Sequence, residues 1–252
     1  MAEIIKISGL ILKASDYGES DKILTVLCAE KGLITVWAKG VRSLKSANRP
    51  LCHPLLYGEF ALYNKGEALW LKEGVSNADY YDISLGLEGL ALVSYFADVV
   101  SYVCLENQDN REILSFLLNT LEINRRGKYA AAHIKAVFEL KIACLLGFAP
   151  LLRCDKCDCK ADVLYVNFAR GGEFLCEKCQ NGGISGAVKL TNPVIKAIAH
   201  VTEGQTGRIY AFSLQKEDED IFNYICENYL MCVTEHKYHT LDYLKELLSC
   251  QI

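Results

Sequence analysis

The chain has 252 residues, of which 51% are hydrophobic and 23% charged, and its formal net charge is −4. This length and balance are typical of a globular protein with two or three small domains, and the negative charge argues against bulk attraction to nucleic acid, although local basic faces remain possible. The most apolar stretch, 85–105, is interrupted by Glu88 and Asp98, so no membrane crossing is expected. The first six residues do not resemble a signal peptide, which predicts a cytoplasmic location.

The first eighty residues predict a small β-barrel. Turn residues separate five short runs of β-branched and aromatic residues, at 7–13, 20–28, 33–38, 58–63 and 68–78. The segment Asn64-Lys65-Gly66-Glu67 fits a tight hairpin turn, because Gly66 can take a positive φ. We therefore expect an OB-fold β-barrel over residues 1–82. A five-stranded sandwich or an SH3-like barrel would give much the same pattern.

After residue 82 the apolar spacing changes from two to between three and four, which predicts helices. The expected helices are 88–105, 109–126, 129–146, 191–201, 218–235 and 240–249. Successive helices with short breaks predict a bundle. The fold class is therefore α+β, with an α-helical domain formed by residues 83–150 and 184–252.

Four cysteines divide the predicted helical domain. Cys154 and Cys157 form one C-x2-C pair, and Cys176 and Cys179 form another after eighteen intervening residues. Paired thiolates at this spacing predict a structural Zn²⁺ site, and a hairpin between the pairs predicts a zinc ribbon inserted at 151–183. A disulfide or four unrelated thiols are the alternatives, but the remaining cysteines are scattered as in reduced cytosolic proteins. Cys159 is a competing fifth thiol that breaks the two-residue spacing.

The chain lacks the common catalytic signatures. None of its five histidines lies in an H-x-E or H-E-x-x-H arrangement, and a zinc ion held by four thiolates has no open position for water. There is also no phosphate-binding loop, dinucleotide fingerprint or G-x-S-x-G elbow. No catalytic residue is predicted, and the chain is expected not to be an enzyme.

The predicted barrel instead offers binding chemistry. Residues 39–49, called the basic loop below, contain no acidic residue, and Trp37 precedes them. Aromatic rings beside cations can stack bases and follow phosphates, as OB folds do with single strands. The candidate nucleic-acid-binding residues are Trp37, Lys39, Arg42, Lys45 and Arg49. The simpler alternatives are a solvated loop and, for Trp70, a place in the core.

Several local sequences together resemble the bacterial RecO family of DNA repair and recombination-mediator proteins. They are the run 10–27, the segment Glu30-Lys31-Gly32-Leu33, the segment 37–43, and Gly147-Phe148-Ala149-Pro150 leading into Cys154. The resemblance follows the whole chain in domain order. It implies an OB fold, a helical domain and an architectural zinc module without catalytic turnover.

The resemblance also implies partners. Such proteins bind single- and double-stranded DNA, anneal complementary strands, and act with RecR to load RecA onto DNA coated by single-strand binding protein (SSB), which implies association with the nucleoid. The family's basic surface matches Lys39, Arg42 and Lys45 here. Candidate residues for receiving the acidic SSB tail are Arg125, Arg126, Lys135 and Lys141. The alternative function is a zinc-containing protein-interaction adaptor with little DNA binding of its own.

Overall fold

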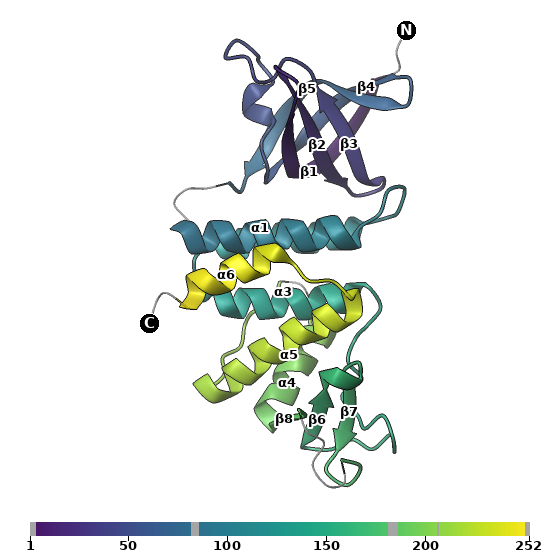
Figure 1. Ribbon diagram of the computed structural model, residues 1–252, viewed down its shortest axis with the longest axis vertical. Coiled ribbons are helices and arrows are strands. Elements are labelled where there is room, and N and C mark those ends of the chain that lie inside the picture. Colours follow the sequence, from purple (N-terminus) through teal and green to yellow (C-terminus); the bar gives the residue numbers. More distant parts are fainter. Residues whose placement is uncertain (1–3, 82–85, 181–185, 206, 250–252) are drawn as a thin grey trace. The chain divides into compact units, whose positions relative to one another are not determined.

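The computed structural model describes residues 4–81, 86–180, 186–205 and 207–249. The chain forms two compact units (Figure 1): unit 1 comprises Met1–Arg126 and Tyr238–Ile252, and unit 2 comprises Gly127–Lys237. The residues of each unit contact one another more than they contact the other unit. This division does not test the domain boundaries predicted at 82, 150 and 183, which stay predictions. The mixed α+β class expected from the sequence is confirmed.

Unit 1 contains a closed five-stranded barrel. Its strands are β1 (Ile4–Tyr17), β2 (Asp21–Cys28), β3 (Gly32–Ala38), β4 (Leu56–Lys65) and β5 (Ala68–Asp79). They are ordered β1-β2-β3-β5-β4, with β1 antiparallel to β4 and β3 parallel to β5. This order confirms the OB fold. At the β4–β5 turn Gly66 has a φ of 67°, which confirms the predicted hairpin.

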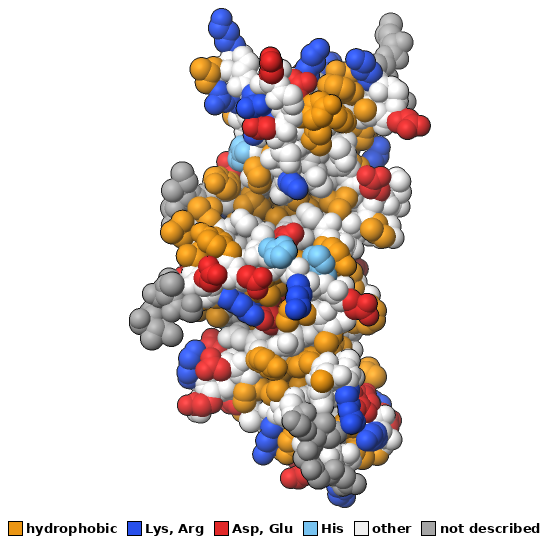
Figure 2. All heavy atoms as spheres, viewed as in Figure 1, with side chains coloured by type: hydrophobic (Ala, Val, Ile, Leu, Met, Phe, Trp, Pro, Cys, Tyr) orange, Lys and Arg blue, Asp and Glu red, His pale blue; other side chains and the backbone are white. Residues whose placement is uncertain are grey.

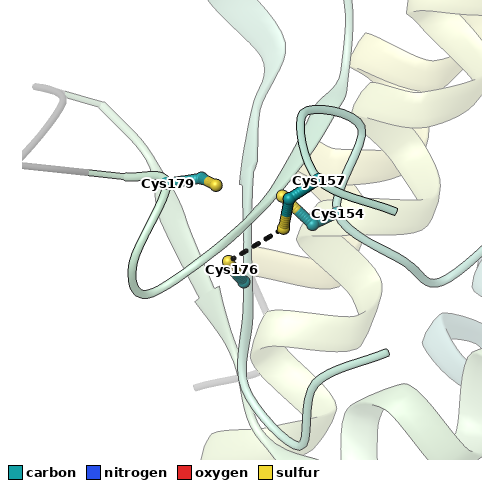
Figure 3. A group of neighbouring side chains, drawn as sticks. All are labelled: Cys154, Cys157, Cys176 and Cys179. Atoms are coloured by element: carbon teal, nitrogen blue, oxygen red, sulfur yellow. Dashed lines mark hydrogen bonds between the residues drawn. The ribbon is translucent and has the colours of Figure 1, made fainter. Parts of the chain in front are cut away.

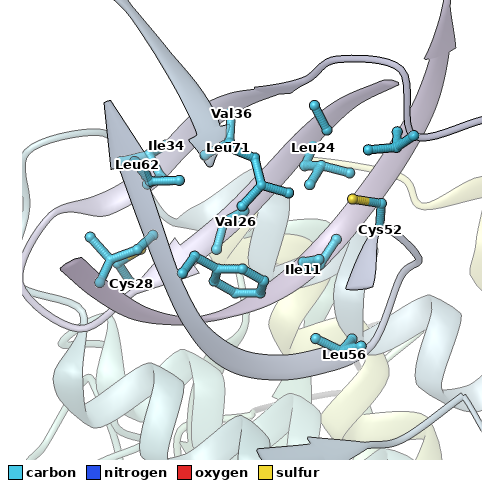
Figure 4. Close-up of a cluster of buried hydrophobic side chains, with 14 residues drawn as sticks. Ile11, Leu24, Val26, Cys28, Ile34, Val36, Cys52, Leu56, Leu62 and Leu71 are labelled. Carbon is cyan, nitrogen blue, oxygen red and sulfur yellow. The ribbon is translucent and has the colours of Figure 1, made fainter. Parts of the chain in front are cut away.

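The barrel closes around a packed apolar core of fourteen buried residues (Figure 4). Along β3 the inward side chains Ile34, Val36 and Ala38 alternate with the outward Thr35 and Trp37, as the two-residue period of a strand requires. Trp37 therefore lies outside the core and is held on the outer face of the barrel.

Three helices complete unit 1: α1 (Gly86–Val103), α2 (Arg111–Arg125) and α6 (His239–Ser249). Helices α1 and α6 pack side by side, with the Thr240 hydroxyl donating to Asp98 at 2.7 Å. By length and composition α1 could cross a membrane, but half of its 18-residue span is buried in the protein. Its side chains Leu92, Phe96 and Val100 have no exposed surface, so α1 is a core helix of unit 1.

Unit 2 contains α3 (Ala131–Leu145), α4 (Asn192–Glu203) and α5 (Lys216–Thr234), which pack pairwise. Between α3 and α4 lies a small antiparallel sheet. Its predicted hairpin is confirmed as β6 (Leu164–Asn167) and β7 (Glu173–Cys176), joined through the 3-10 turn η3 (Phe168–Arg170). A third strand, β8 (Val188–Leu190), pairs with β6 and was not predicted, because three residues are too short to show a period.

Candidate metal centre and nucleic-acid interface

The four predicted metal ligands lie together in unit 2 (Figure 3). The sulfurs of Cys154, Cys157, Cys176 and Cys179 are all within 4.8 Å of one another. Four thiolates in a tetrahedron around Zn²⁺ would be separated by about 3.8 Å. The Cys157 and Cys176 sulfurs, which come from different knuckles, are 3.7 Å apart. The cluster therefore fits a tetrahedral metal ion with no position left for water.

Local hydrogen bonds hold the two knuckles in place. In the second knuckle, the backbone N–H groups of Cys179 and Gln180 both donate to the Cys176 carbonyl at 3.0 Å. The first knuckle is fastened to β7 through Asp155, whose carboxylate accepts the Phe174 N–H at 2.6 Å. The sulfurs are thus positioned by backbone turns and by the Asp155 carboxylate.

The thiols differ in acidity. Burial opposes ionisation of Cys154, but backbone N–H groups of Cys176, Cys157 and Lys156 outweigh it and lower the pKa of Cys154 to about 6. The backbone N–H of Cys179 likewise lowers the pKa of Cys176. Metal ions bind thiolates, so these N–H groups favour the form that coordinates.

Cys159 lies beside the cluster without belonging to it. Its sulfur is 3.3 Å from that of Cys157, and the side chain is half-buried. Hydrogen bonding to neighbouring sulfurs raises the pKa of Cys159 to about 12, and it does the same for Cys179, so position and not acidity sets Cys159 apart from the cluster. The four-sulfur set consists of the predicted two pairs.

On the barrel, three aromatic rings form a surface stack, called the aromatic ladder below. Trp37 stacks on Trp70 with ring centres 5.7 Å apart, and Tyr17 meets Trp37 edge-on at 4.8 Å. The Lys65 ammonium lies 5.5 Å from the Trp70 ring centre, in a cation–π arrangement. Trp70 is half-buried and outside the barrel core, so a core position is ruled out for it.

The basic loop begins two residues after Trp37 of the aromatic ladder. Lys39, Lys45 and Arg49 are exposed, and none forms an ion pair with a described residue. Arg42 differs, because its guanidinium lies 3.2 Å from Asp16 and donates to the Gly18 carbonyl at 2.9 Å. Arg42 thus fastens the loop to the β1–β2 turn. Figure 2 shows Lys and Arg side chains over the barrel, interspersed with acidic ones.

The predicted partner-binding cations are divided between the two units. In unit 1, Arg125 and Arg126 are exposed, and both pair with Glu122, at 2.8 and 2.9 Å. In unit 2, Lys141 Nζ donates to the carbonyls of Val201, Thr202 and Gly204 at the end of α4, at 3.2 to 3.4 Å. These bonds satisfy carbonyls that the helix end leaves open.

Lys135 requires a correction. Its side chain is only 6% exposed and lies between the carboxylates of Glu139, at 3.1 Å, and Glu227, at 2.8 Å. Burial alone would lower the pKa of Lys135, but the two carboxylates outweigh burial and raise it. A buried, doubly paired ammonium cannot receive a surface peptide. The sequence prediction missed this burial because, although Glu139 lies one helical turn from Lys135, nothing local relates Lys135 to Glu227, ninety-two residues away.

A closed OB barrel followed by helices and a cluster of four cysteines defines the class of protein: an OB-fold protein with a candidate metal site. Two family models together match most of the chain: "Recombination protein O N terminal" over residues 1–76 and "Recombination protein O C terminal" over residues 85–242. The chain therefore belongs to the RecO family of DNA repair proteins.

Individual relatives agree with this assignment. The DNA repair protein RecO of Acetivibrio thermocellus is 30% identical, over 96% of this chain and 97% of its own length. The RecO proteins of Caldicellulosiruptor bescii and Clostridium perfringens are each 26% identical, over 96% of this chain and 98% of theirs. The similarity thus runs through the barrel, the helices and the cysteine module.

Proposed function

We propose that the protein is a non-enzymatic recombination mediator. In this role it binds single- and double-stranded DNA, anneals complementary strands, and acts with RecR to load RecA onto SSB-coated DNA in the cytoplasm, at the nucleoid. Family membership supports a place in DNA repair. The observation that carries the DNA-binding step is that the aromatic ladder and the basic loop adjoin on one surface of the barrel.

The two features are joined by direct contacts. Tyr17 of the ladder ends β1, and Arg42 of the basic loop bonds to Asp16 and Gly18 on either side of it. Aromatic rings supply stacking surfaces for any base, and nearby cations neutralise phosphates. A single strand passing over Tyr17 would bring its backbone within reach of Lys39, Lys45 and Arg49. Trp37 and Trp70 cover each other, so Tyr17, which is 51% exposed, offers the most accessible ring.

The remaining roles follow from the other sites. We propose Zn²⁺ as the ion of the cysteine cluster, with an architectural role, because four thiolates leave no open coordination position. For the acidic SSB tail, exposed Arg125 and Arg126 are the better candidates, since Lys135 is buried and Lys141 is committed to the end of α4.

A charge-reversal experiment tests the DNA-binding step. The variant Lys39→Glu/Lys45→Glu/Arg49→Glu leaves Arg42 and its loop contacts intact. Its control, Lys189→Glu/Lys196→Glu/Lys216→Glu, makes the same charge change at exposed positions of unit 2. Affinity for a single-stranded oligonucleotide is measured by fluorescence anisotropy across a salt series, and annealing is measured with SSB-coated complementary strands.

We expect the barrel variant to lose at least about tenfold in affinity and its log–log salt slope to shrink by about 2, because about 0.7 counterion is released per single-strand phosphate contact. Annealing should fall in parallel, and the control should match the wild type. Equal affinities for both variants would reject the basic loop as the DNA site. Negligible wild-type binding at low salt would instead support the protein-interaction adaptor.

A further inference from the structure

Leu44 projects from the basic loop into solvent. It is 86% exposed, the largest exposed fraction among the large apolar side chains described. Isolated apolar side chains on a surface are common and need no explanation by themselves. Leu44 differs in its position, because it lies between the cations Arg42 and Lys45 of a loop that meets the aromatic ladder.

The exposure of Leu44 is imposed by an ordered backbone. Successive turns close the loop, with the Ser43 N–H donating to Gly40 at 3.2 Å and the Ser46 N–H donating to Ser43 at 3.1 Å. Just before the tip, Val41 is only 2% exposed and belongs to the barrel core. The loop therefore presents Leu44 outward from a fixed base.

Contacts on both sides of the tip fix the loop to the strands. On one side, the Gly40 N–H donates to Asp21 at 2.8 Å and the Arg42 N–H donates to Ser20 at 2.9 Å. On the other side, the Asn48 amide donates to the Lys72 carbonyl on β5 at 2.9 Å. The backbone at Leu44 therefore cannot fold back onto the barrel without breaking several of these hydrogen bonds.

We propose that Leu44 is a wedge that enters the base stack when the basic loop contacts duplex DNA, which rests on the DNA binding proposed above. Apolar side chains carried between cations are a recurrent means of unstacking a base step, because the cations hold the phosphates while the apolar group replaces a stacked neighbour. Lys45 and Arg49 would hold the backbone, and the Leu44 methyl groups would fill the opened step. Unstacking at this step would kink the duplex and lower the cost of opening it there.

The test separates unstacking from binding. Full-length, zinc-loaded protein is titrated into duplex oligonucleotides that contain 2-aminopurine, whose fluorescence rises when it is unstacked, and anisotropy reports binding in the same samples. The variants are Leu44→Ser and the conservative Leu44→Met. Leu151→Ser, at a site 73% exposed in unit 2, is the matched control. Unchanged thermal unfolding verifies that each variant folds.

At saturation the wild type, Leu44→Met and Leu151→Ser should increase 2-aminopurine fluorescence. Leu44→Ser should lose most of the increase while its affinity changes by less than about fivefold, because the phosphate contacts remain. If the wild type binds duplex DNA without any increase, or if Leu44→Ser retains it, the wedge is rejected and the DNA-binding function stands. If the wild type does not bind DNA, both proposals are rejected.

Discussion

The barrel and the cysteine module are both small β structures, but they are stabilised in different ways. The barrel encloses fourteen buried core residues within five strands that leave no free edge. Among the described residues, the apolar cluster around the four sulfurs has only three buried members, and two of them are the candidate metal ligands Cys154 and Cys176. A barrel of this kind is stabilised by burying apolar surface, whereas we expect the turns around so small a cluster to depend on a bound metal ion.

Removing the metal should therefore affect the two regions unequally, and this is the largest effect we expect. Cys176→Ser should lose the bound zinc, and residues 154–180 should lose hydrogen-exchange protection, because a structural zinc ion contributes on the order of 10 kcal/mol to folding. Amides of β1–β5 should keep their protection. Zinc content by elemental analysis and hydrogen exchange by mass spectrometry measure both.

The matched control for this change is Cys159→Ser, which removes the neighbouring thiol outside the four-sulfur set. It should retain one zinc ion per chain and normal protection of the module. Loss of barrel protection in Cys176→Ser, or a metal-free module that stays protected, would contradict the difference between the two regions.

The sequence revealed these two regions because both have local signatures. Period-two runs predicted the barrel strands, and the C-x2-C spacing predicted the cluster in Figure 3. The sequence did not reveal the contacts that join residues far apart along the chain. The Trp37–Trp70 stack, the Arg42–Asp16 contact and the burial of Lys135 each join residues that no local pattern relates.

The helices of unit 2 are stabilised in a third way, by a buried lysine paired with two carboxylates. Removing this lysine should give the second largest effect. Lys135→Met should destabilise unit 2 by about 3–5 kcal/mol, because the carboxylate of Glu139, which is 0% exposed, would lose its ammonium partner in the interior. Chemical denaturation followed by circular dichroism measures the change. Zinc content should stay at the wild-type level.

A surface pair of the same unit provides the comparison. Lys216 lies 3.0 Å from Asp220, but the two side chains are 75% and 61% exposed. Lys216→Met should leave the stability close to that of the wild type, since solvent screens exposed pairs. Similar costs for the two lysines would show that burial does not control the Lys135 site.

The smallest effect concerns His133 of α3, a nearly buried residue whose Nε2–H donates to the Tyr210 carbonyl at 3.0 Å. Burial lowers the pKa of His133 below its ordinary value of 6.5, although the Tyr210 carbonyl and Glu219 oppose the shift. The folded protein therefore binds a proton at His133 less readily than the unfolded chain does. Stability from this group is fully present above pH 6.5 and falls as the pH drops toward the folded pKa.

The variant His133→Gln keeps a side-chain N–H that can donate to the Tyr210 carbonyl, and it removes the ionisable imidazole. Between about pH 7.5 and 5.5 its unfolding free energy should decline less steeply than that of the wild type, as proton linkage requires. Equal slopes for the wild type and His133→Gln would mean that His133 is protonated in the folded state without cost, so that the helices of unit 2, like the barrel, would depend on apolar packing rather than on the charge state of this residue.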